Sequence, residues 1–63
     1  TGLGMAVVAN KFNGIRATPC WNVSTAEISR RHNDSNCLTL GGRVLRLEEA
    51  VAIVIAWIES AYE

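Results

Sequence analysis

The sequence has no excess of charge of either sign. Six basic residues balance six acidic residues over 63 positions, and the only adjacent basic pair is Arg30–Arg31. A protein that binds nucleic acid or an anionic membrane usually carries a basic patch or stripe. The composition therefore predicts no nucleic-acid partner and no membrane partner, and it favours a small ligand.

Long apolar runs are missing as well. The longest, Ala50–Ile58, has nine residues, whereas a membrane-spanning helix needs about 20. The chain does not open with the charged and then apolar pattern of a secretory signal peptide. We therefore predict a cytoplasmic protein without a membrane-spanning segment.

The chain has only two cysteines and one histidine. No Cys/His cluster with metal-ligand spacing is present, so we predict no metal site. In a reducing cytosol Cys20 and Cys37 are expected to be free thiols that pack as small hydrophobes. The chain is much shorter than a typical domain of roughly 100–150 residues. On this prediction neither a disulfide nor a metal ion would stabilise it. Because 49% of its residues are hydrophobic, we expect its apolar surface to meet something outside the segment.

Apolar periodicity near the start predicts a helix with one buried face. Four residues follow the i, i+3, i+4, i+7 spacing of such a face: Met5, Val8, Ala9 and Phe12. The pair Asn13–Gly14 readily adopts the left-handed conformation that ends a helix. Two strands are predicted next, Ile15–Cys20, which is limited by Pro19, and Cys37–Leu40.

A second helix is predicted between the two strands. Ser24–Glu27 matches a capping box, and Val23 and Ile28 are spaced as a hydrophobic staple around it. Asn33–Asn36 is a cluster of turn-forming residues that should end the helix, and we expect Arg30–Arg31 on its solvated face. Strand, helix and strand make a βαβ unit, in which the strands are parallel and the crossover is right-handed.

A last helix is predicted from Leu47 to Tyr62. Glu48 and Glu49 favour its N-terminus. Apolar residues follow on every side, so more than one of its faces must be covered. The order helix, strand, helix, strand, helix places the chain in the α/β class, as one piece of one domain.

Three features carry possible chemistry. Thr1–Gly4 opens a helix, where backbone N–H groups can bind an anion, although a glycine pair is commonly just a tight turn. His32 stands at a helix end, where a histidine is most often a solvated or capping residue. Arg43 follows two glycines past a strand, at the edge where α/β sheets bind ligands, and the alternative is an ordinary surface arginine.

Four segments taken together are more specific than any one of them. They are Thr1–Met5, Ala9–Ala17, Ser29–Asn36 and Leu40–Val44. This combination closely resembles the type B ribose-5-phosphate isomerase family, which also includes galactose-6-phosphate isomerase subunits, and the similarity runs over essentially all 63 residues. Residues 1–63 are therefore expected to be a partial sugar-phosphate isomerase domain, truncated at both ends.

The resemblance implies a Rossmann-like parallel sheet in a three-layer sandwich, and a homodimer with active sites at its interface. It also implies an isomerase of the pentose phosphate pathway that interconverts ribose 5-phosphate and ribulose 5-phosphate through an enediolate, without a metal or other cofactor.

Residue roles follow by position from the resemblance. His32 would help to open the furanose ring, and Thr1 would lie near the ring oxygen. The main chain of Gly2, Leu3 and Gly4 would form the anion hole for the enediolate.

The resemblance assigns two further residues to the substrate. Asn33 would contact the sugar, and Arg43 would contact the substrate or its phosphate.

The chain departs from the family pattern in its catalytic base. The catalytic cysteine of many members stands two residues before the position of Thr1, and other members have a glutamate at the position of Leu3. Without either base, the 63 residues alone are expected to be nearly inactive.

Geometry predicts how such a site would be assembled. A helix that starts at Ser24 carries His32 about 12 Å along its axis, at 1.5 Å per residue, away from the edge where helix N-termini gather. His32 should therefore not reach the Gly2–Gly4 loop of its own chain. A site that uses both would be built from two subunits.

Other interpretations remain open from the sequence. A galactose-6-phosphate isomerase, or an isomerase of another sugar phosphate, fits nearly as well. A non-catalytic remnant or dimerisation module would keep the apolar last helix. A general phosphate or nucleotide binder would use only the Thr1–Gly4 loop.

Overall fold

The structure is a computed structural model that describes residues 1–42 and 45–63. Its elements follow in the order helix, strand, helix, strand, helix. They are α1 (Leu3–Ala9), β1 (Ala17–Pro19), α2 (Val23–Arg31), β2 (Cys37–Thr39) and α3 (Leu47–Glu59). The predicted α/β class and the predicted order of elements are confirmed.

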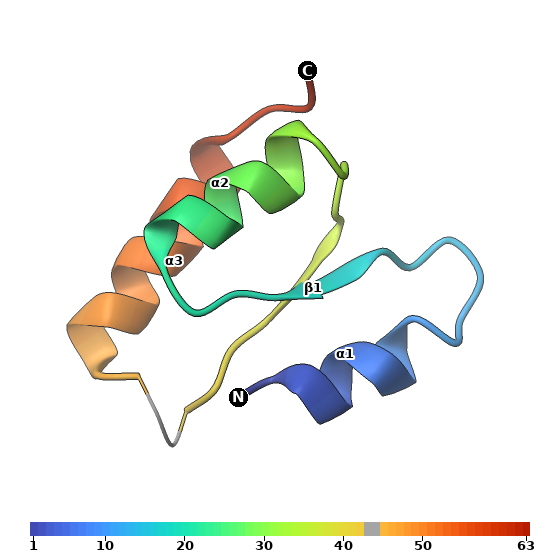
Figure 1. The fold of residues 1–63 in the computed structure, drawn as a ribbon, viewed down its shortest axis with the longest axis horizontal. Helices are drawn as coiled ribbons and strands as arrows, with labels where there is room; N and C mark the ends of the chain where they lie inside the picture. Colours follow the sequence, from blue (N-terminus) through green and yellow to red (C-terminus); the bar gives the residue numbers. More distant parts are fainter. Residues whose placement is uncertain (43–44) are drawn as a thin grey trace.

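The two strands pair in parallel, with Ala17 opposite Cys37 and Pro19 opposite Thr39. The connection between them is α2, so the predicted βαβ unit is present. The strands pass between α1 on one side and the packed pair α2 and α3 on the other (Figure 1). The chain is thus arranged in three layers, and no helix in its described ranges is long and apolar enough to cross a membrane.

The core lies between the sheet and the α2–α3 layer. Cys20, Ala26 and Ile53 are fully buried there. Partly buried residues pack around these three: Leu38, Leu40, Leu45, Ala56 and Trp57. Only one face of α3 is used in this way, and apolar side chains such as Val51 and Ile55 remain about half exposed.

The predicted buried face of α1 is wrong. Met5, Val8 and Phe12 are 69%, 54% and 66% exposed, and the residue that packs against the sheet is Ala6, at 4%. The helix ends at Ala9, so Phe12 lies beyond it. Apolar residues occur all round this helix, so their periodicity does not identify the buried side. The small side chain of Ala6 lets the helix approach the strands closely.

The first strand is Ala17–Pro19 instead of the predicted Ile15–Cys20, and it ends at Pro19, which agrees with the prediction that this proline limits it. The N–H of Cys20 donates to the Thr39 carbonyl, so the nitrogen of Pro19 faces away from β2, where its missing donor breaks no ladder hydrogen bond. On the same outer side, the Asn10 amide accepts from the Ala17 N–H at 2.6 Å and donates to the Ala17 carbonyl at 2.9 Å. The Asn10 side chain thus pairs with the outward-facing N–H and carbonyl of Ala17 as the backbone of a neighbouring strand would.

The start of α2 differs from the prediction. Asn22, not Ser24, is the N-cap: its side chain accepts from the Thr25 N–H at 2.8 Å, and its own N–H donates to the Thr25 hydroxyl at 3.2 Å. Ser24 and Val23 both lie inside the helix, so the predicted capping box and staple are wrong. Asn22 is as good a cap as serine and has the extended backbone that a cap needs.

The last helix is shorter than predicted. It ends at Glu59 instead of Tyr62, because Ser60 has an extended backbone and its hydroxyl donates to the Ala56 carbonyl at 2.8 Å. The N–H of Glu63 then donates to the Arg31 carbonyl at the end of α2. The C-terminal residues are therefore attached to the second helix.

Replacing the observed cap tests this account of α2. We expect Asn22→Ala to destabilise the full-length protein by about 0.5–2 kcal/mol, because the backbone N–H of Thr25 loses the side-chain oxygen that accepts from it. Chemical denaturation measures the difference. The matched control is Ser24→Ala, which should change stability by less than about 0.5 kcal/mol, as exposed substitutions usually do. A larger loss for Ser24→Ala than for Asn22→Ala would contradict the observed cap.

Candidate active site

The first residues of the chain cross the end of β2 at very close range. The Thr39 hydroxyl donates to the Gly2 carbonyl at 2.8 Å. Gly2 has a φ of +83°, a left-handed conformation that favours glycine, and a methyl group added there would lie 3.0 Å from the Leu40 nitrogen. A methyl group added to Gly41 would lie 2.5 Å from the Thr1 Cα. The crossing therefore depends on glycine at both positions.

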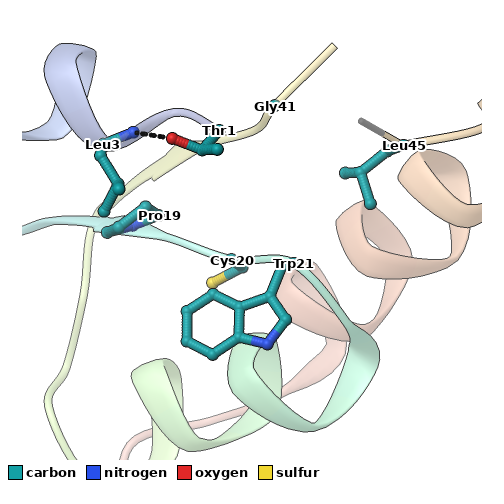
Figure 2. A pocket seen from close by; sticks show the side chains of 7 residues that line it. All are labelled: Thr1, Leu3, Pro19, Cys20, Trp21, Gly41 and Leu45. Carbon is teal, nitrogen blue, oxygen red and sulfur yellow. Dashed lines mark hydrogen bonds between the residues drawn. The ribbon is translucent and has the colours of Figure 1, made fainter. Parts of the chain in front are cut away.

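A cavity of about 220 Å³ opens beside this crossing. Figure 2 shows Thr1 and Leu3 at one side of it, and Pro19, Cys20 and Trp21 at another. Gly41 and Leu45 complete the lining. The cavity lies at the carboxyl ends of two parallel strands, which is the edge where open α/β sheets bind ligands.

The start of α1 presents backbone donors next to the cavity. The first N–H groups of a helix have no acceptor within the helix. The Leu3 N–H is directed only at the Thr1 hydroxyl, at a long 3.4 Å. A methyl group added to Gly4 would meet no other part of the described residues within 4 Å, so a ligand has room there. The structure thus brings together Thr1, Gly2, Leu3 and Gly4, the first group of predicted site residues.

His32 and Asn33 lie elsewhere. α2 begins just after the carboxyl end of β1 and runs for nine residues, so its far end is about 13 Å away at 1.5 Å per residue. His32 caps that far end, and both side chains are exposed. In Figure 1 this end of α2 lies near the C-terminus and away from the N-terminus. A single chain does not bring His32 to the Thr1–Gly4 loop.

Arg30 is not on a solvated helix face, contrary to the prediction. Its Nη1 donates to the Ser35 carbonyl at 2.6 Å, and its guanidinium lies 4.6 Å from the centroid of the Trp57 ring. Arg31 does remain exposed, with its guanidinium 3.8 Å from the Glu27 carboxylate. The sequence could not distinguish the two neighbours, because the partner of Arg30 lies on α3.

Arg43, which is predicted to contact the substrate or its phosphate, lies outside the described residues. In residues 1–42 and 45–63 no group of three or more His, Cys, Asp or Glu side chains is placed to hold a metal ion.

Cys20 is the one thiol that lines the cavity, and it is 1% exposed. Burial raises the pKa of this thiol, and hydrogen bonds with Ser29 and Thr25 only partly oppose the effect. A thiol with a raised pKa stays protonated near neutral pH, so Cys20 is a packing residue and a poor proton acceptor.

Comparison with known proteins adds to this geometry. The model of the Ribose/Galactose Isomerase family matches residues 1–63. The chain belongs to this family. It is 51% identical over its whole length to ribose-5-phosphate isomerase B of Escherichia coli, of which it covers 42%. It is 43% identical, again over its whole length, to D-erythrulose-4-phosphate isomerase of Pectobacterium atrosepticum, of which it covers 41%.

Solved structures of the family share the fold. Ribose-5-phosphate isomerase B from Giardia lamblia superposes with a TM-score of 0.97 at 40% identity, over all of this chain and 47% of that one. The protein from Clostridium thermocellum gives a TM-score of 0.96 at 48% identity, over 98% of this chain and 42% of that one. The chain spans less than half the length of these relatives. Its Rossmann-like layers are those of the corresponding part of a ribose/galactose isomerase.

The glycine crossing gives a direct test of the site geometry. We expect Gly41→Ala to destabilise the full-length protein by about 1–3 kcal/mol, because the new methyl group meets the backbone of Thr1 and not a movable side chain. Thermal unfolding measures the loss. Gly42→Ala is the matched control: its methyl group meets no atom of the described residues within 4 Å and should have little effect. Equal stability of the two variants would show that Thr1 does not lie against Gly41.

Proposed function

We propose that the full-length protein interconverts an aldose phosphate and a ketose phosphate through an enediolate, with ribose 5-phosphate and ribulose 5-phosphate as its main pair. The observation that carries the proposal is the loop at Thr1–Gly4, which presents backbone donors beside a cavity at the carboxyl edge of the sheet. Membership of the ribose/galactose isomerase family supports it, as does 51% identity to a protein named ribose-5-phosphate isomerase B.

The loop would stabilise the charge that develops during the reaction. Removing a proton from the carbon beside the carbonyl makes an enediolate, whose oxygen carries negative charge. The N–H groups of Leu3 and Gly4 are fixed by the first turn of α1 and would donate to that oxygen. Preorganised donors of this kind are worth about 10²–10³ in kcat each. The Thr1 hydroxyl would lie near the ring oxygen.

His32 and Asn33 would serve the sugar itself. An imidazole can act as a general acid or a general base, which suits the opening of a furanose ring. The Asn33 amide would hydrogen-bond to a sugar hydroxyl. We assign Arg43 to the substrate or its phosphate, because a guanidinium can bind phosphate with two hydrogen bonds.

The proton-transferring base would come from outside these 63 residues. Leu3 is apolar, and the raised pKa of Cys20 makes it a poor base. General acid–base catalysis that lacks its base typically loses about 10²–10⁴-fold in rate. We therefore expect the 63 residues alone to be nearly inactive, and the full-length protein to act as a cytoplasmic enzyme without a metal or other cofactor.

The site would be shared by the two subunits of a homodimer. α2 separates His32 from the Thr1–Gly4 loop by its whole length, so one chain supplies the loop and a second chain supplies His32 and Asn33. A twofold dimer makes two such sites. The apolar side chains that remain exposed, including Leu47 and Ile58 on α3, leave ample surface for subunit contacts.

Other sugar phosphates are the second candidate. One relative, 43% identical, is named D-erythrulose-4-phosphate isomerase, and the family description includes galactose. Turnover of ribose 5-phosphate by the full-length protein should exceed turnover of a four-carbon or a six-carbon sugar phosphate. The reverse order would assign the other substrate, and no turnover of any of them would favour a non-catalytic dimerisation module.

Mixing two inactive variants tests the shared site. His32→Ala removes the imidazole, and Gly4→Val places a side chain in the open space beside the donors. Each variant alone should lose most of its activity. When the two are unfolded and refolded together, half of the dimers should be mixed and carry one intact site each. We expect about a quarter of the wild-type rate to return.

The control is a mixture of His32→Ala with Asn33→Ala. Both changes lie on the same side of the shared site, so every site in a mixed dimer is defective and no activity should return. Absence of rescue in the first mixture would refute the shared site. Rescue in both mixtures would show that His32 and Asn33 serve different sites.

A further inference from the structure

We propose that Arg30 and Trp57 are positioning residues for His32 and Asn33, and that they act by fixing the turn between α2 and β2. This inference rests on the proposed function, because it assigns the network a role in placing His32. Neither residue would touch the substrate. Arg30 and Trp57 are half-buried and Ser35 is buried, whereas the side chains that the network would position are exposed.

The backbone of the turn decides where His32 and Asn33 point. Within the described residues, neither side chain makes a hydrogen bond to the rest of the chain. The His32 N–H donates to the Ile28 carbonyl, and the Ser35 N–H donates to the Ser29 carbonyl. Between them Asp34 has a φ of +51°, a left-handed conformation that a non-glycine residue adopts at some cost. A turn of this shape needs to be held by its surroundings.

Arg30 holds the turn from inside the protein. Its Nη1 donates to the Ser35 carbonyl at 2.6 Å, and its Nε donates to the Ser60 carbonyl at 3.4 Å. The Trp57 ring lies against the guanidinium at 4.6 Å, and the Trp57 Nε1 donates to the Ser35 hydroxyl at 2.9 Å. Arg30, Ser35 and Trp57 thus form a closed ring of contacts between α2, the turn and α3.

The hydroxyl of Ser35 continues this network into the core. It donates to the Ser29 hydroxyl at 3.1 Å, and the two serines are 1% and 4% exposed. Polar groups buried in this way are a poor means of gaining stability, because apolar residues of similar volume often do as well. They do fix one geometry, since every member is satisfied by a directed partner.

Arg16 holds the same turn from the solvent side. Its Nε donates to the Asp34 carbonyl at 2.7 Å, and its Nη2 lies 3.4 Å from the Asp34 carboxylate. The Asn36 side chain accepts from the Arg16 N–H at 2.8 Å. These groups are exposed, so Arg16 contributes less than the half-buried contacts around Arg30.

The test uses substitutions that remove single contacts in the full-length protein. Trp57→Phe keeps an aromatic ring beside Arg30 and removes the hydrogen bond to Ser35. Arg30→Lys keeps the charge and removes the planar fork. Misplacing a reacting group by about 1 Å can cost on the order of 10²-fold in rate. We expect each variant to lower kcat about 10- to 100-fold while KM for ribose 5-phosphate changes less than about threefold.

A double-variant cycle separates positioning from a general loss of structure. If Arg30 acts through His32 and Asn33, then Arg30→Lys added to a variant that carries both His32→Ala and Asn33→Ala should be no slower than that variant without it. Independent losses that multiply in the combined variant would overturn the proposal. Arg31→Lys is the matched control, because Arg31 is the exposed neighbour on the same helix, and its kcat should not change.

The remaining outcomes are also decisive. If Arg30→Lys fails to fold, Trp57→Phe with and without the pair His32→Ala and Asn33→Ala gives the same cycle. If the wild-type protein is active and loses activity in His32→Ala, but Trp57→Phe and Arg30→Lys both keep full kcat, the positioning role is wrong and the proposed function stands. If the wild-type protein isomerises no sugar phosphate, the proposed function itself fails.

Discussion

The contact on which the rest of the site depends is the crossing of Thr1–Gly2 over the end of β2. The two backbones approach so closely that a methyl group on Gly41 would collide with Thr1. This approach fixes the start of α1 at the carboxyl edge of the sheet, and the hydrogen bond from Thr39 to Gly2 holds it there. The cavity and the backbone donors beside it follow from that one constraint.

Parallel pairing imposes the second feature of the architecture. Because β1 and β2 run in the same direction, α2 must begin at the edge that carries the loop and end at the opposite edge. His32 therefore lies a helix length from the loop in the same chain. The two regions are also held by different means, the loop by close backbone packing at glycines and the turn by directed polar contacts around Arg30 and Arg16.

The sequence predicted the features that depend on local signals. Turn-forming residues after α1 and α2 and two short apolar segments were enough for the order of elements and for the parallel βαβ unit. The separation of His32 from the loop followed from helix geometry alone. The roles that we propose for Thr1, Gly4 and His32 needed the family resemblance, because a glycine pair and a lone histidine are common in turns and at helix ends.

Features set by distant partners were not predictable. Asn22 and Ser24 are both suitable caps, and only the path of the chain after Cys20 decides between them. The sequence places Arg30 on a solvated helix face, because the Trp57 ring that lies against its guanidinium is 27 positions further along and belongs to another helix. The apolar stripe on α1 predicts a buried face at Met5, Val8, Ala9 and Phe12, but the buried residue of this helix is Ala6, which borders the stripe.

The most direct test of the central claim is a crystal structure of the full-length protein with a bound analogue of the enediolate. The account predicts that the charged oxygen of the analogue lies within hydrogen-bond distance of the Leu3 or Gly4 nitrogen of one chain. It also predicts that the imidazole nearest to the analogue is His32 of a second chain. An analogue that contacts the loop and His32 of the same chain, or that binds away from the Thr1–Gly4 loop, would contradict it.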